Sequence, residues 1–295
     1  MTLLKQGMLA FIALSITANS IACSMDGSGG FVPENQMRIP VSMKSANGGL
    51  TEEQFNNVIT KVITEYEPVI KSLGAELVVE RNWTDATVNA YAMQSGKKWT
   101  VAMFGGLARH QAITEDGFAL VVCHELGHHI GGAPKKAGQW ASPWASNEGQ
   151  ADYFATLKCL RKVWLNDDNR SIVSSMKLPE ALIRSCGSSW VWNNDFDMCL
   201  RLGMAGDSVA QLFAGLRGQS TPAKFDTPDP KVVTKTDDNH PATQCRLDTY
   251  LQGALCTADY REDVSPKEEV TGTCHAKLGY DYGLRPLCWF KPSVQ

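Results

Sequence analysis

The chain has 295 residues, with 28 basic side chains (Lys and Arg), 31 acidic ones (Asp and Glu) and a formal net charge of −3. This length suits one large or two small domains, and the near-neutral charge offers no basic surface for nucleic acid or anionic membranes. Hydrophobic residues make up 43% of the chain, which is too many for a disordered protein. No apolar run reaches the roughly 18 residues of a membrane span, so we expect no such helix in the mature protein.

The first segment has the features of an export signal. Lys5 precedes an apolar run over residues 8–16, and small residues follow it at Ala18, Ser20 and Ala22. Such a run is too short to span a bilayer and is typical of a secretory signal peptide, here residues 1–22. We therefore expect an exported protein that is periplasmic, anchored in the outer membrane as a lipoprotein, or secreted.

Cys23 follows the predicted signal peptide, and two interpretations of its processing stay open. The tetrad Ser20-Ile-Ala-Cys23 fits ordinary cleavage after Ala22, and it also resembles a bacterial lipoprotein box in which Ser20 replaces the usual Leu. Setting Cys23 aside leaves eight of the nine cysteines, an even number that suggests four disulfides in an oxidising compartment. Cys23 is thus our lipidation candidate, and its lipid would be the only link to a membrane. Sequence leaves the pairing of the others open, but local pairing predicts Cys186–Cys199, Cys245–Cys256 and Cys274–Cys288, with Cys123 left for Cys159.

The first half of the chain predicts a tether, one long helix and a small sheet. Residues 23–50 are rich in Gly, Ser and Asn, as is typical of a tether. Thr51 and Gln54 then form the pattern of a capping box, which begins a helix that we expect Pro68 to kink and Gly74 to end. Three β-like runs follow at residues 76–83, 87–93 and 98–104, and the short turns between them predict an antiparallel meander.

The second half is predicted to be mainly helical. One helix begins near Thr114 and stops at Gly131, and the next spans about residues 147–164. Periodicity weakens over residues 165–236, which we interpret as an insertion with one helix at residues 207–216. A further helix is expected after Pro241, and residues 258–295 are interpreted as a disulfide-rich tail.

A metal-binding motif lies inside the second predicted helix. His124 and His128 are four residues apart, so they lie about 40° apart around the helix and about 6 Å apart along it, where two imidazoles can share one Zn²⁺. Glu125 would point beside them as the general base. Apolar neighbours surround the motif, and burying unpaired imidazoles there would cost free energy unless they bind something. We expect the adjacent His129 to be solvated.

Two carboxylates on the third predicted helix complete the candidate site. Glu148 and Asp152 are again four residues apart, and Glu148 lies 20 residues after His128, which leaves room for a loop between two packed helices. We assign Glu148 as the third metal ligand. Asp152 would accept the free ring N–H of a ligating histidine and so fix its orientation.

These motifs resemble those of the gluzincin metallopeptidases, and among them the prenyl-protein (CaaX) endopeptidases with their soluble bacterial relatives. The resemblance covers residues 51–257, so it implies an α+β zincin core there with one catalytic zinc ion. The family's transmembrane helices are absent, and the tail has no counterpart. The matching segments, in chain order, are Val88-Asn-Ala-Tyr-Ala92, residues 100–104 with Gly105-Gly-Leu107, His124-Glu-Leu-Gly-His128, Asn147-Glu-Gly-Gln-Ala-Asp152, and His240-Pro241 with Arg246.

The resemblance also implies roles for residues outside the ligand set. His240 is the candidate for stabilising the oxyanion, and Arg246 for ordering that element or pairing with an acid near the site. An edge strand would bind an extended peptide or protein substrate through backbone hydrogen bonds. Its residues would be Thr100, Val101, Ala102, Met103 and Phe104.

Three functions remain open from the sequence. The first is an exported zinc endopeptidase in which Glu125 acts on water at the metal. The second is a gluzincin-scaffold binding or adaptor protein of the cell envelope, which would not need Glu125. The third is a zinc amidase that acts on a non-peptide or cell-wall substrate.

Overall fold

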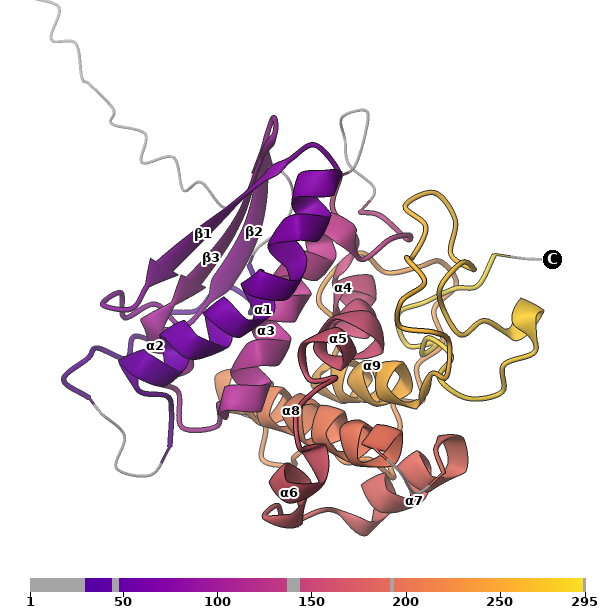
Figure 1. Ribbon diagram of the computed structural model, residues 1–295. Coiled ribbons are helices and arrows are strands. Elements are labelled where there is room, and N and C mark those ends of the chain that lie inside the picture. The colour runs from indigo at the N-terminus through magenta and orange to yellow at the C-terminus, as the bar shows by residue number, and fades with distance from the viewer. Residues whose placement is uncertain (1–29, 44–47, 137–143, 192–193, 294–295) are drawn as a thin grey trace, which may run out of the picture.

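The computed structural model describes residues 30–43, 48–136, 144–191 and 194–293 of the chain. The predicted signal peptide, Cys23, and residues 24–29 and 44–47 of the predicted tether lie outside these residues. The described part is an α+β fold with one small sheet and many helices (Figure 1). Within it, no helix is both long enough and apolar enough to cross a membrane.

The elements follow one another closely along the chain. They are α1 (Glu52–Ser72), β1 (Glu76–Asn82), β2 (Ala90–Ser95), β3 (Lys98–Phe104), α2 (Gly105–Ala108), α3 (Glu115–Ile130), α4 (Glu148–Phe154), the π-helical turn η1 (Ala155–Cys159), α5 (Leu160–Val163), α6 (Asn169–Ser174), α7 (Glu180–Ser189), α8 (Asn194–Leu216), α9 (Thr243–Leu255) and the 3₁₀ turn η2 (Ala276–Leu278).

Helix α1 begins as its sequence predicts. The Thr51 side chain accepts from the backbone N–H of Gln54, and the Gln54 side chain accepts in return from the backbone N–H of Thr51, so the capping box satisfies two N-terminal donors. Pro68 lies inside the helix. One face of the helix is buried against the core through Phe55, Ile59, Val62, Tyr66 and Ile70.

The sheet differs from the predicted antiparallel meander. Its strand order is β1-β3-β2, with β1 parallel to β3 and β2 antiparallel to it. The meander prediction is therefore wrong, and so is the assignment of Thr100, Val101, Ala102, Met103 and Phe104 to an edge strand, because β3 is the central strand. The edge beside helix α3 belongs to β2.

Two glycines explain why the chain crosses from β1 to β2 past the end of β3. The connection over residues 83–89 passes so close to α2 that a Cβ on Gly105 would lie 1.8 Å from the Trp83 carbonyl oxygen. A Cβ on Gly106 would lie 2.0 Å from the Ala86 carbonyl oxygen. The connection can adopt this path only because neither residue carries a side chain.

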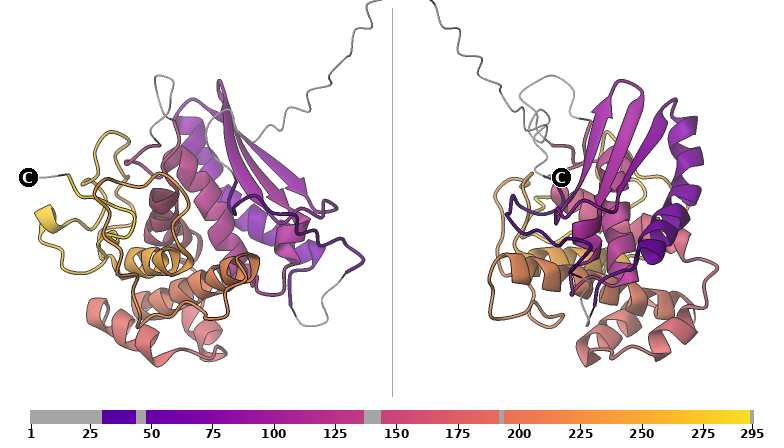
Figure 2. Two further views of the ribbon diagram at one scale, coloured as in Figure 1. Left: turned by 180° about the vertical axis from the view of Figure 1, so that it is seen from behind. Right: turned by 90° about the vertical axis from the view of Figure 1, so that its left-hand side faces the viewer.

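Helix α3 is the central element of the fold. It is buried from Gly117 to His129 and packs against α1, β2 and β3 on one side and against α4 and α8 on the other. Its N-terminus is capped by Thr114, whose side chain accepts from the backbone N–H of Gly117. Figures 1 and 2 place the sheet and the C-terminal tail on opposite sides of the central helices.

The region interpreted as an insertion contributes long helical structure to the core. Helix α8 begins at Asn194, well before the predicted start at residue 207, and packs against α3 and α9. Its buried side chains include Phe196, Leu200, Leu212 and Phe213. The periodicity is weak because α8 is buried on most of its surface, and only a narrow stripe that includes Asp207 and Gln211 is polar and at least partly exposed to solvent.

Four disulfides join the eight cysteines of the described part. Cys123–Cys159 and Cys186–Cys199 form as local pairing predicts. The other two predicted pairs are wrong, because the bonds are Cys245–Cys288 and Cys256–Cys274. The tail folds back over the start of α4, where a Cβ on Gly149 would lie 2.2 Å from the Trp289 ring, and this packing brings Cys288 to Cys245 rather than to Cys274.

Candidate metal centre

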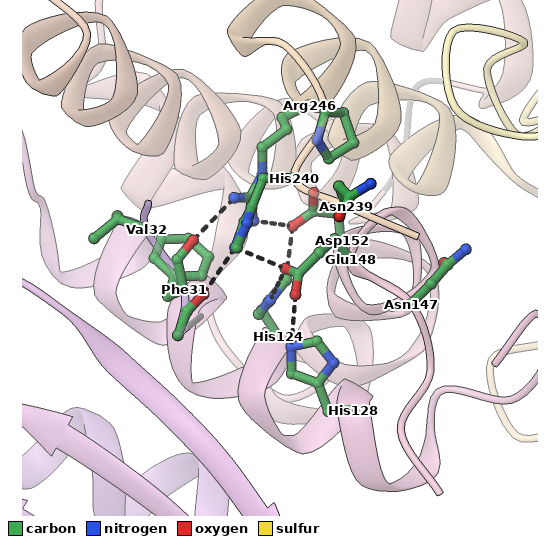
Figure 3. A network of polar contacts seen from close by, with 12 residues as sticks. Phe31, Val32, His124, His128, Asn147, Glu148, Asp152, Asn239, His240 and Arg246 are labelled. Carbon is green, nitrogen blue, oxygen red and sulfur yellow. Dashed lines mark hydrogen bonds and ion pairs between the residues drawn. The ribbon is translucent and has the colours of Figure 1, made fainter. Parts of the chain in front are cut away.

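Helices α3 and α4 bring the three predicted ligands to one point. His124 and His128 project from α3, and Glu148 is the first residue of α4 (Figure 3). The distance from His124 Nε2 to Glu148 Oε2 is 3.3 Å, and from His128 Nε2 to Glu148 Oε1 it is 3.7 Å. One ligand atom from each residue lies within 4.8 Å of the others, so the cluster could hold a metal ion.

Small residues and local hydrogen bonds hold the two helices together. A Cβ on Gly127 would lie 3.0 Å from the Ala151 Cα, so a larger residue there would push α4 away from α3. The backbone N–H of Ser146 donates to the His128 carbonyl at 2.9 Å, and the Gln150 amide donates to the Gly131 carbonyl at 2.6 Å. Asn147 caps α4 by accepting from the backbone N–H of Gln150, which sets where Glu148 begins the helix.

Hydrogen bonds at Nδ1 orient both histidine rings. His124 Nδ1 lies 2.7 Å from Asp152 Oδ1, and His128 Nδ1 lies 2.8 Å from the Ser146 carbonyl oxygen. Because both acceptors require Nδ1–H, Nε2 of each ring, which faces Glu148, is the nitrogen left to bind a metal ion. This arrangement, with a carboxylate or carbonyl behind each imidazole, is typical of metal-binding histidines.

Several polar atoms at this point are buried without a hydrogen-bond partner. They are His124 Nε2, Glu148 Oε2 and both carboxylate oxygens of Glu125. His124, Glu125 and Glu148 are each 0% exposed, so solvent does not satisfy them. Leaving such groups unpaired is costly, and a cation among them would remove that cost. Two imidazole nitrogens and one carboxylate form a donor set suited to Zn²⁺ with an open coordination position.

The pKa values of the two histidines are shifted in opposite directions, by burial at His128 and by neighbouring carboxylates at His124. Burial lowers the pKa of His128 to about 3, so this ring stays neutral and able to bind a cation. Burial also acts to lower the pKa of His124, but Asp152 and Glu148 outweigh it and raise that pKa to about 9. A metal ion must therefore displace a proton from His124. Burial raises the pKa of Glu125 to about 8, and a bound cation would favour its ionised form.

Lys136 is a neighbour of the ligands that sequence reasoning missed. Its ammonium donates to Glu148 Oε1 at 2.8 Å. Burial acts to raise the pKa of Glu148, but His240, His128 and Lys136 together hold it well below its usual range. Glu148 is therefore ionised, with Oε1 held by Lys136. Lys136 lies in a Gly- and Pro-containing loop, and nothing in its sequence surroundings indicates this contact.

His240 and Arg246 also lie at the centre. His240 Nε2 is 3.3 Å from Glu148 Oε2 and donates to the Gly30 carbonyl at 2.7 Å. Arg246 projects from α9 and donates to Asp152 Oδ1 at 2.6 Å. Burial opposes the charge of Arg246, but Asp152 outweighs it and raises the pKa of the guanidinium above its usual value. Arg246 thus holds the carboxylate that orients His124.

Tyr250 and Phe31 complete the surroundings of His124, and neither was predicted from the sequence. The Tyr250 hydroxyl donates to Asp152 Oδ1 at 2.8 Å, and Tyr250 lies one helical turn after Arg246. That spacing on α9 could have indicated it. The Phe31 ring stands edge-on to the His124 ring at 4.9 Å between centroids. Phe31 comes from the segment predicted to be a tether, so no local pattern placed it here.

His129 is buried, and its predicted solvation is wrong. Its ring stacks between Trp99 and Trp144, with centroid distances of 5.3 Å and 5.0 Å. Nε2 donates to the Thr100 carbonyl at 3.0 Å, and Nδ1 accepts from the Gln94 amide at 3.1 Å. The ring therefore fastens α3 to the sheet through strand β3, which explains why it turns away from the ligands.

Comparison with known proteins gives no match for this chain. No family model, no curated protein and no solved structure matches it.

Proposed function

We propose that this protein is an exported zinc-dependent endopeptidase with a zincin-type core. The observation that supports this most directly is Glu125: a buried carboxylate without any hydrogen-bond partner, next to a His-His-Glu cluster that could hold a metal ion. A site that only binds metal does not need such a group. A hydrolytic site does, because it needs a base close to the reacting water.

Each residue of the centre would have a distinct part in hydrolysis. His124, His128 and Glu148 would hold the zinc ion, which when bound lowers the pKa of water and polarises a carbonyl. Glu125 would accept a proton from the attacking water and pass it to the leaving nitrogen. His240 donates at 2.7 Å to a backbone carbonyl beside the ligands, the hydrogen bond that a developing oxyanion needs.

Strand β2 is the substrate edge in this proposal, in place of β3. It pairs with β3 on one side, and on its other side the Ala90 carbonyl accepts from Phe31, whose ring lies 4.9 Å from the His124 ring between centroids. An extended peptide or protein substrate could add to that side through backbone hydrogen bonds.

The test compares the wild type with Glu125→Gln and with Glu115→Gln. Glu115 is on the same helix, but it is exposed and bonds to Gln54 away from the centre. We expect all three proteins to bind one zinc ion each. Casein cleavage should fall by about 10²–10⁴-fold in Glu125→Gln, the size of a lost general base, and stay unchanged in Glu115→Gln. Equal activity in the wild type and Glu125→Gln would contradict the assignment, and absence of zinc from the wild type would remove the site itself.

A further inference from the structure

The segment Gly30–Val32 of this chain lies on the substrate edge of strand β2. The backbone N–H of Phe31 donates to the Ala90 carbonyl at 2.8 Å, and the backbone N–H of Val32 donates to the Asn89 side-chain oxygen at 3.1 Å. Ala90 is the first residue of β2 and pairs with Met103 of β3 on its other side. The segment therefore binds where a peptide substrate would add to the sheet.

The carbonyls of this segment point to the two residues that assist at the metal centre. The Gly30 carbonyl accepts from His240 Nε2 at 2.7 Å. The same nitrogen lies 3.3 Å from Oε2 of the proposed ligand Glu148, as Figure 3 shows. The Phe31 carbonyl accepts from Arg246 at 3.0 Å. The Gly30 carbonyl is thus bound by His240, the residue proposed to stabilise an oxyanion. The next carbonyl along the chain, that of Phe31, is bound by Arg246.

The side chain of Phe31 fills an apolar pocket next to a metal ligand. It is 0% exposed, and its ring lies 4.9 Å from the His124 ring and 5.3 Å from the Phe213 ring between centroids. The Arg246 guanidinium covers it at 4.7 Å. Such a pocket fits a large apolar side chain on the residue that follows Gly30.

Gly30 fits its position because it has no side chain. A Cβ there would lie 2.7 Å from the Asn89 side chain and 2.8 Å from the Ala90 carbonyl, and its φ of +76° is a conformation that favours glycine. The segment can approach β2 closely enough for the Gly30 carbonyl to accept from His240 because residue 30 is glycine. The buried ring of Phe31 then holds the segment there.

We propose that the protein cleaves its own chain between Gly30 and Phe31. This inference rests on the proposed peptidase function and names its first substrate. Water adds its oxygen to the Gly30 carbonyl carbon, the bond from that carbon to the Phe31 nitrogen breaks, and both water protons end on that nitrogen, one of them by way of Glu125. The products are a carboxylate at Gly30 and an ammonium group at Phe31. Cleavage would separate the lipidation candidate Cys23 from the folded domain. We expect other substrates to carry a large apolar residue directly after the bond that is cut.

The test follows the N-terminus of the exported, zinc-loaded full chain by intact mass and N-terminal sequencing. We expect the wild type to begin at Phe31, whereas Glu125→Gln keeps the residues before it. Adding wild-type protein to Glu125→Gln should leave that variant uncut, because the bond is held in its own site. Met37→Ala, an exposed change in the described stretch 30–43 but outside the segment, should be cut like the wild type.

Two further variants separate this inference from the proposed function. Phe31→Asp places a charge in the apolar pocket, and Gly30→Val adds a side chain that clashes with β2, so each should keep its N-terminus and leave the site open to casein. Zinc content and thermal unfolding show whether each variant is folded. One folded variant is enough for the test. An intact Gly30–Phe31 bond in the wild type overturns the inference, as does equal cutting in Glu125→Gln. If the wild-type bond stays intact while these variants cleave casein, the peptidase stands and the segment is only an inhibitory plug. If the wild-type bond stays intact and these variants do not cleave casein either, both proposals fail.

Discussion

Two arginine–carboxylate clusters in this molecule look alike and differ in one respect. At the metal centre, Arg246 binds Asp152 and its guanidinium lies 4.1 Å from the Phe213 ring centroid. Far from it, Arg201 of α8 binds Asp116 at 2.7 Å and Asp167 at 2.8 Å, and its guanidinium lies 3.9 Å from the Trp164 ring centroid.

The difference is in what each cluster leaves unpaired. Around Arg246 the buried atoms without hydrogen-bond partners include Asp152 Oδ2 and Arg246 Nε. His124, whose ring is hydrogen-bonded to Asp152, adds its Nε2 to them. In the described part of the chain, no buried polar atom of Arg201, Asp116 or Asp167 lacks a partner. A satisfied cluster joins helices, whereas a cluster with unpaired atoms next to histidines is arranged for a ligand. The same residue types are therefore fully paired in one place and, in the other, lie beside unpaired atoms that could bind a cation.

The largest expected effect on stability comes from breaking the buried pair at the metal centre. Arg246→Met leaves Asp152 charged and fully buried, so we expect the free energy of unfolding to fall by about 3–5 kcal/mol. Arg201→Met should cost less, about 1–3 kcal/mol, because Asp116 and Asp167 can turn to solvent. Denaturant unfolding of both variants measures the difference. Equal losses would mean that the two clusters do not differ as described.

A smaller effect is expected on metal affinity. Asp152→Asn weakens the acceptor that orients His124, so zinc affinity should fall by about 10–100-fold. Asp167→Asn is the matched control, because it removes the same charge from an arginine-bound carboxylate outside the centre. Competition with a chelating dye measures both affinities. An unchanged affinity in Asp152→Asn would show that Asp152 serves the fold alone.

The smallest effect is the pH dependence of the Arg201 cluster. Burial acts to raise the pKa of Asp167, but Lys61 and Arg201 outweigh it and lower the pKa below its usual value. A carboxyl whose pKa is lowered on folding contributes stability above its unfolded pKa of about 3.9, and this contribution is lost as pH falls through the folded pKa. Because the pair is partly exposed, we expect at most about 1 kcal/mol.

Unfolding of the wild type and Asp167→Asn at several pH values checks this expectation. The difference in free energy of unfolding should be largest near neutral pH and shrink towards strongly acidic pH. A difference that grows on acidification would give the opposite sign and contradict the assigned cause.

The sequence by itself predicted the parts of the site that depend on helix geometry. His124 and His128 share a helix face, as do Glu148 and Asp152, because residues four apart always do in an α-helix. The capping residues Thr51 and Thr114 likewise mark helix starts through contacts within one turn. The helices and the β-like runs were predicted from local patterns, and the resemblance implied the α+β class. The metal-ligand assignment needed only one further assumption, that the two helices pack together.

Only the tertiary structure decided which distant segments meet. The placement of β3 between β1 and β2 depends on the missing side chains of Gly105 and Gly106, and the Cys245–Cys288 bond depends on the tail returning to α4. Lys136 and Phe31 reach the centre from irregular segments that carry no periodic pattern. Such contacts join residues far apart in the chain, and the packing of whole elements determines them, so spacing along the sequence does not encode them.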